Sequence, residues 1–175
     1  MKILRDLLEK QLQNLYNSEL LILILSVKTS FIKKELLILK ALAEMQEYVT
    51  DYELQDILLM YTRETHDQKV RLEEIGELLK SKIAVKDGNI IRGLLEDVRE
   101  LYREFPKGLL MDMGIITKLM HITHFQISGY ESALLFSKNL DIGEMSEKLE
   151  KTLDEAYEAD EYCATYAKNI MLKKK

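Results

Sequence analysis

The stretch YELQDILLMYTRETHDQKVRLEEIGELLK, residues 52–80, decides the fold that we expect for this chain. Its spacing of three and four places one set of residues on a single face of an α-helix: Leu54, Leu58, Tyr61, Thr65, Gln68, Leu72, Ile75 and Leu79. Thr65 and Gln68 interrupt this face at mid-helix, with Glu64 beside them. Because polar groups inside a helical core cost free energy unless they are satisfied, the pattern predicts a buried polar network or a metal site.

Three further segments, at residues 2–28, 109–138 and 144–172, repeat an apolar helical face with a polar position near its middle. The polar positions are Glu19 in the first segment, Thr123 and Gln126 in the second, and Asp160 in the third, where Glu155 and Glu158 flank it. Helices of this kind are typical of an all-α four-helix bundle with a buried central site. We therefore expect Glu64, Gln68, Gln126 and Asp160 to share one buried layer.

The connections between these helices show two further features. A shorter amphipathic helix is expected at residues 90–105, after a loop at 81–89 and before Pro106 and Gly108. Residues 50–53, Thr-Asp-Tyr-Glu, have the form of a capping box, in which Thr50 would cap the helix that follows.

The pentapeptide ELLIL occurs twice, beginning at Glu19 and again at Glu35. On one continuous helix, at about 100° per residue, these two glutamates would lie roughly 160° apart, so both cannot face one core. A break within residues 29–34, or an inserted segment after the first helix, is the expected resolution.

The composition narrows the class of protein. The 175 residues, of which 47% are hydrophobic and 31% charged, fit a single domain spanning residues 1–175. The net charge is −5 and the one basic cluster is the three lysines at 173–175, so we expect no nucleic-acid partner. The apolar run at 20–25 is far shorter than the roughly 20 residues of a membrane span. A lone cysteine, Cys163, and the lack of a signal peptide favour the cytoplasm.

Four segments, taken in order, resemble the YciF-like family of bacterial ferritin-like proteins, a stress-associated group. They are LRDLLEKQLQNLYNSE at 4–19, ELQDILLMYTRETHDQKVRLEEI at 53–75, HFQISGYESA at 124–133 and TLDEAYEADEY at 152–162. The resemblance implies a ferritin-like four-helix bundle, a homodimer, and a central dinuclear iron or manganese site ligated by glutamates.

The chain departs from the family pattern at the centre of that site. Thr123, Gln126 and Ala156 stand where the resemblance implies glutamates. Two bound dications need hard anionic oxygens, for which a glutamine carbonyl is a weak neutral substitute. The candidate metal ligands that remain are Glu19, Glu64, Gln68, Gln126, Glu155 and Asp160, with Glu35 as the alternative to Glu19. We favour Glu19, because it interrupts a clean apolar face.

Two functions follow from these expectations. The preferred one is a non-enzymatic or regulatory, stress-associated protein that has lost its metal site, or binds iron or manganese only weakly. The alternative is a non-haem iron or manganese protein with oxygen or peroxide chemistry. His121 and His124 lack the Glu-x-x-His partner of such sites, and no nucleophile triad, phosphate loop or nucleotide motif indicates another enzyme class.

Overall fold

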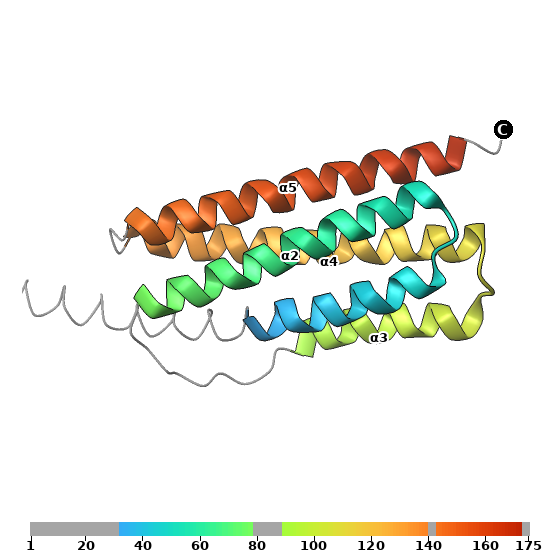
Figure 1. Ribbon diagram of the computed structural model, residues 1–175, viewed down its shortest axis with the longest axis horizontal. Coiled ribbons are helices and arrows are strands. Elements are labelled where there is room, and N and C mark those ends of the chain that lie inside the picture. The colour runs from blue at the N-terminus through green and yellow to red at the C-terminus, as the bar shows by residue number, and fades with distance from the viewer. Residues whose placement is uncertain (1–31, 79–88, 140–142, 173–175) are drawn as a thin grey trace, which may run out of the picture.

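The computed structural model describes residues 32–78, 89–139 and 143–172 of the chain (Figure 1). These parts are almost entirely helical: residues 32–48, α2 (Tyr52–Leu78), α3 (Asn89–Glu104), α4 (Leu109–Asn139) and α5 (Gly143–Leu172). The expected helical bundle is confirmed, together with the shorter helix before the third long one. The break expected within residues 29–34 falls partly outside the described residues, and from residue 32 the chain is helical.

The helices are arranged around two clusters of buried apolar side chains, and we call the larger one the core. In Figure 1, α5 lies along one edge with α2 and α4 next to it, and the helix at 32–48 and α3 lie on the other side. α5 packs against both α4 and α2, and α3 packs against α4. The core draws buried residues from each helix, including Leu42, Leu58, Ile91, Leu119 and Cys163. Within the described residues, no helix is both long and apolar enough to cross a membrane.

The buried face of α2 is the one that the sequence predicted. Leu54, Leu58, Tyr61, Thr65, Gln68, Leu72 and Ile75 are all 3% exposed or less, and Leu79 lies outside the described residues. The face predicted for α4 is likewise buried from Ile116 to Ala133. The polar interruptions at Thr65 and Gln68 therefore lie inside the core.

The buried face of α5 does not include Asp160, the polar position predicted near its middle. Leu153, Asp160 and Ala167 are only half-buried, whereas the preceding residues Thr152, Ala159 and Tyr166 are buried. Because α5 contacts helices on two sides, its buried stripe is wider than one row of side chains and is centred toward these neighbours. Asp160 consequently lies at the edge of the core.

The start of α2 corrects the predicted capping box. Asp51 is the capping residue: its Oδ1 accepts the backbone N–H of Glu53 at 2.9 Å and that of Leu54 at 3.2 Å. Thr50 does not cap the helix, because its backbone N–H and hydroxyl donate to the carboxylate of Asp112 in α4, at 2.9 and 2.6 Å. Asp112 is itself buried, so this contact ties the start of α2 to the first turn of α4.

We expect Asp112→Ala to lower the free energy of unfolding by about 1–3 kcal/mol, because it leaves the donors of Thr50 without their acceptor. Asp51→Ala should cost about 1 kcal/mol, the usual loss for a helix cap. Urea denaturation followed by circular dichroism measures both. Asp56→Ala, on an exposed part of α2, is the control and should stay within about 0.5 kcal/mol of the parent. Equal losses for all three variants would contradict the assignment of Asp51 as the helix cap and of Asp112 as the acceptor for Thr50.

The turn between α3 and α4 and the packing of these helices depend on two glycines. Gly108 has a φ of 137°, which favours glycine just before α4 begins. Gly114 faces Leu101 so closely that an added Cβ would lie 3.0 Å from Leu101 Cδ1. This close approach holds α3 against α4. Tyr102 of α3 also stacks on Tyr48, with ring centroids 3.8 Å apart.

Candidate functional site

A hydrogen-bonded group of five buried side chains occupies the middle of the bundle. We call it the amide–carboxylate network, and its members are Glu35, Tyr61, Gln68, Gln126 and Tyr130. Gln126 is its centre: Nε2 lies 3.0 and 2.8 Å from the two carboxylate oxygens of Glu35 and 3.3 Å from Gln68 Oε1. The Tyr61 hydroxyl donates to Gln126 Oε1, and the Tyr130 hydroxyl donates to Glu35 Oε1 at 2.7 Å. The network thus joins three helices.

The carboxyl group of Glu35 titrates near neutral pH. Burial raises its pKa from 4.5 to about 7, while the hydrogen bonds from Gln126 and Tyr130 and the charge of Lys34 act in the opposite direction. The hydrogen bonds are those of an ionised carboxylate, since both oxygens act as acceptors. Glu35 is therefore close to the balance between its neutral and charged forms.

The structure places Glu35, our alternative, at the first-helix position of this network, and the preferred Glu19 lies outside the described residues. A sequence signal for Glu35 did exist. Glu35 is followed at helical spacing by four buried residues, Ile38, Leu42, Met45 and Val49, so it also interrupts a clean apolar face. In the sequence we applied this argument only to the earlier copy of ELLIL, and for that reason we favoured Glu19.

A second polar group lies beside the network on α2. Glu64 is half-buried, and its Oε2 is enclosed, as are Thr65 Oγ1 and Gln68 Nε2; no described residue forms a hydrogen bond with these three atoms. The pKa of Glu64 is raised to about 7, mainly by burial and then by the charges of Glu155 and Glu158, while the charge of Arg71 acts in the opposite direction. Glu64 thus shares a predominantly acidic edge of the bundle with α5.

Glu155 has a cationic partner that the sequence reading missed. The Arg71 guanidinium forms an ion pair with Glu155 and donates from Nε to Thr152 Oγ1 at 2.9 Å. Both charged side chains are largely buried, at 12% and 21% exposure. The charge of Glu155 is therefore neutralised across the contact of α2 with α5.

Asp160 is held from the side of α4. Thr123 Oγ1 donates to its Oδ1 at 2.7 Å, and His124 Nε2 lies 3.1 Å from the same carboxylate. His124 is exposed, so this contact reaches from the edge of the core to the surface. His124 therefore contacts one of the candidate ligands.

The predicted site residues come together only in part. Gln68 and Gln126 are buried and hydrogen-bonded to each other, whereas Glu64 and Asp160 are half-buried at the edges of the same region. Both carboxylates act on Cys163, whose pKa rises to about 12 mainly through burial and then through their charges. The residues thus surround one layer, with amides at its centre and carboxylates at its margins.

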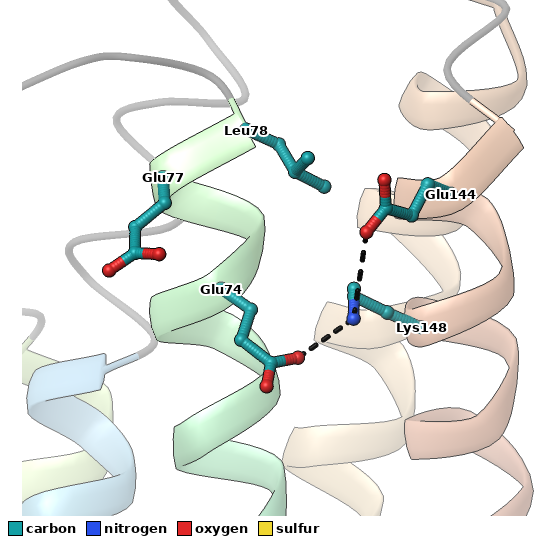
Figure 2. Close-up of a pocket in the computed structure, with 5 residues that line it drawn as sticks. All are labelled: Glu74, Glu77, Leu78, Glu144 and Lys148. Carbon is teal, nitrogen blue, oxygen red and sulfur yellow. Dashed lines mark hydrogen bonds and ion pairs between the residues drawn. The ribbon is translucent and has the colours of Figure 1, made fainter.

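A separate surface pocket of about 460 Å³ lies where the end of α2 faces the start of α5 (Figure 2). Lys148 points between Glu74 and Glu144 in this pocket, with its Nζ 2.8 and 3.8 Å from their carboxylates. Glu77 and Leu78 complete the lining. Its one lysine is paired with Glu74 and Glu144, so the pocket offers less chemistry than the central layer.

The comparisons with known proteins agree with this architecture. A family model described as "Domain of unknown function (DUF892)" matches residues 32–175. The chain belongs to this family. The match begins at residue 32, so Glu35 lies within the matched segment and Glu19 lies outside it. No curated protein sequence matches the chain significantly.

Solved structures extend the likeness to the fold. The Escherichia coli stress protein YciF matches with a TM-score of 0.80 and 23% identity, over 90% of this chain and 98% of that one. YcfI from Rhodopseudomonas palustris matches with a TM-score of 0.77 and 24% identity, over 82% and 91%. A protein from Xanthomonas campestris matches with a TM-score of 0.64 and 18% identity, over 90% and 94%. The chain therefore has a YciF-like fold.

Proposed function

We propose that this DUF892 protein is a non-enzymatic, stress-associated bundle protein in which the amide–carboxylate network takes the place of a ferritin-like dinuclear metal centre. One observation carries the proposal: the amide nitrogen of Gln126 lies within hydrogen-bond distance of both carboxylate oxygens of Glu35. A carboxylate that accepts hydrogen bonds on both oxygens is already satisfied without a metal. The stress association rests on the description of its structural neighbour YciF as a stress protein.

The charges around the layer also oppose two bound dications. The network contains a single carboxyl group, with a pKa raised to about 7, among amides and phenols. Glu155 is neutralised by Arg71, and Asp160 is held by Thr123 and His124. Iron and manganese in bridged pairs require several anionic oxygens at once. Among the described residues, no three Asp, Glu, His or Cys side chains converge closely enough to share an ion.

The network has a structural role under this proposal. Hydrogen bonds between buried side chains fix the register of the helices that contribute them, since a shifted helix would leave these donors and acceptors unpaired. Glu35, Gln68 and Gln126 come from the helix at 32–48, α2 and α4. The protein then acts through its surface, and the buried free thiol of Cys163 suits a reducing cytoplasm.

The metal content of protein purified without chelator tests the proposal. We expect iron and manganese far below one ion per chain, and ferrous iron added in air should be oxidised no faster than in buffer. Glu35→Gln is the matched variant, because it removes the one carboxylate of the network while keeping its shape, and it should leave both readouts unchanged. Binding of two irons per chain with rapid oxygen consumption would overturn the proposal.

A second candidate function is a single-metal site next to Glu64. It is favoured by the enclosed Oε2 of Glu64 and by Thr65 Oγ1 beside it, which lack hydrogen-bond partners among the described residues. Iron or manganese held there would supply oxygen or peroxide chemistry. Under this alternative, one metal per chain would be bound, Glu64→Gln would abolish the binding, and Glu35→Gln would preserve it.

A further inference from the structure

A groove runs along the second half of α5, where this helix packs beside the start of α2 (Figure 1). It consists of two hollows that share Tyr162 and Thr165, and we call it the tyrosine groove. The first hollow, of about 380 Å³, lies between the two helices and has Ile57 and Met60 in its wall. The second hollow, of about 410 Å³, is lined by residues of α5. No residue of the amide–carboxylate network belongs to either lining.

The charge of the tyrosine groove has one sign. Four carboxylates and no basic residue of the described chain line it: Glu53, Asp56, Glu158 and Glu161. Elsewhere on the surface, carboxylates form ion pairs with cationic side chains, as Glu44 does with Arg99. Within the described ranges, the carboxylates of the groove other than Glu53 form no such pair. An occupant with positive charge is therefore favoured.

A buried hydroxyl group gives a second, independent indication of an occupant. Tyr166 lines the first hollow, and only 1% of this residue is exposed. Its hydroxyl forms no hydrogen bond of normal geometry with a described residue, although the carboxyl group of Asp51 lies nearby. Because a buried polar atom without a partner costs free energy, an N–H group of an occupant would gain a hydrogen bond there.

The walls of the groove also select a hydrocarbon chain. Ile57 and Met60 are apolar, and the ring of Tyr162, which is 53% exposed, offers a face that attracts both methylene groups and cations. From Glu158 to Thr165, α5 extends over about 10 Å at 1.5 Å per residue, so the carboxylates are spread along the groove. The ligand that fits is elongated, with cationic groups separated by an aliphatic chain.

We propose that the tyrosine groove binds a linear aliphatic polyamine. One ammonium group lies beside Asp56 and donates to the hydroxyl of Tyr166, and a second lies beside Glu161. The methylene groups between them pack on Tyr162. The volume of each hollow is within the usual range for small-molecule sites. The binding needs neither the amide–carboxylate network nor a metal, so its test is independent of the metal assays above.

Isothermal titration calorimetry with spermidine at low ionic strength tests the proposal. We expect a dissociation constant on the order of 100 μM, as for a few exposed ion pairs with an apolar contact, which rises as sodium chloride is added. Mg²⁺ carries charge without hydrocarbon, and 1,8-octanediol carries hydrocarbon without charge, so neither should bind in this range. No binding of spermidine, or binding of Mg²⁺ as tight as that of spermidine, would overturn the proposal.

The aromatic wall is tested with two tyrosine variants. Tyr162→Ala should raise the dissociation constant for spermidine about five- to tenfold, because it removes the ring that both hollows share. Tyr157→Ala is the matched control, since Tyr157 lies on the same helix at 46% exposure but outside both linings. It should leave the constant unchanged. Equal effects of the two variants would rule out the tyrosine groove as the site.

The polar contacts are tested one group at a time. Asp56→Asn and Glu161→Gln should each weaken spermidine binding about two- to fivefold, whereas Glu147→Gln, at an exposed position of α5 outside the groove, should not. Tyr166→Phe should weaken binding by a similar factor without lowering the melting temperature, because the hydroxyl that it removes has no partner in the free protein. An equal loss for Glu147→Gln would indicate unspecific attraction of cations, and an unchanged affinity of Tyr166→Phe would exclude the proposed hydrogen bond; either result contradicts the site.

Discussion

Gln126→Leu is expected to lower the free energy of unfolding by about 3–5 kcal/mol at pH 8, because it leaves a buried charge without compensation. The variant removes the amide that donates to both oxygens of Glu35 and accepts from Tyr61. Only Tyr130 would still donate to the carboxylate from within the network. Leucine has a volume close to that of glutamine, so the loss reports polar interactions more than packing.

The size of this loss should depend strongly on pH. The pKa of Glu35 is raised from 4.5 to about 7 in the folded protein, mainly by burial, and removing the hydrogen bonds of Gln126 raises it further. Above pH 4.5 and up to the raised value, the folded state binds more protons than the unfolded state. Stability therefore falls as pH rises through this window, by at most about 1.4 kcal/mol per pH unit. Near pH 5 the variant should lose only about 1–2 kcal/mol.

Urea denaturation at several pH values between 5 and 8 measures both effects. Thr123→Val is the matched control on the same helix, since it removes a hydrogen bond to the half-buried Asp160 and should cost only about 1 kcal/mol with little change across pH. Adding Glu35→Gln to Gln126→Leu should remove the part of the pH dependence that comes from Glu35, while Glu64, whose pKa is also raised to about 7, keeps its own contribution. An equal loss at pH 5 and pH 8 would show that Glu35 is not a buried, titrating member of the network.

The positions of the helices could be predicted because they depend on local patterns. The face of α2 repeats over its whole length, and Pro106 and Gly108 mark the end of α3. Thr65, Gln68, Thr123 and Gln126 could be identified for the same reason, since a polar residue on a regular apolar face stands out. These signals need only the periodicity of a single helix.

The hydrogen-bond and ion-pair partners of those residues depend on which helices pack together. The periodicity of a single helix does not indicate this packing. Arg71 lies beside the buried face of α2, at a position where a cation is usually solvated. It becomes the partner of Glu155 only because α5 packs against α2. Asp112 lies in the first turn of α4, where an acidic residue is favourable because of the helix dipole. The sequence therefore gives no separate indication that Asp112 contacts Thr50. Tyr61 was predicted as a residue of the apolar face of α2, but the network uses its hydroxyl group, as it does that of Tyr130.

The choice between Glu19 and Glu35 shows a different limit. Each glutamate begins a copy of the same pentapeptide, ELLIL. Either copy could supply the buried carboxylate, and a single sequence ranks the two alternatives poorly. Glu35 is fully buried and continues into the face of Ile38 and Leu42, whereas Glu19 lies outside the described residues.

Gln126→Glu tests whether the central layer can be returned to metal binding. Glutamate has nearly the shape of glutamine, and Nε2 of Gln126 lies 3.0 and 2.8 Å from the Glu35 oxygens, so the substitution brings two carboxyl groups to hydrogen-bond distance. Such a pair shares one proton and resists the loss of the second. Without metal, the variant should lose on the order of 3 kcal/mol at pH 8, and less at pH 6, where one carboxyl group stays protonated.

A divalent cation should recover much of that loss, because it neutralises both carboxylates and binds only the folded chain. At a free Mn²⁺ concentration 100 times the dissociation constant, binding adds about 2.7 kcal/mol to the free energy of unfolding. The measurement is a set of urea curves for the parent and Gln126→Glu, each with and without Mn²⁺. His121→Glu, an exposed change on the same helix, is the control and should show neither the loss nor the recovery.

The two ways in which this prediction can fail have different meanings. If Gln126→Glu is as stable as the parent without metal at pH 8, water reaches position 126 and the layer is not dry. If the variant is destabilised and Mn²⁺ gives no recovery, the oxygens of Glu35 and of the new glutamate do not converge on one cation. In the second case the amide of Gln126 is not a replacement for a metal ligand, and the ferritin-like interpretation of this layer is wrong even though the bundle itself is correct.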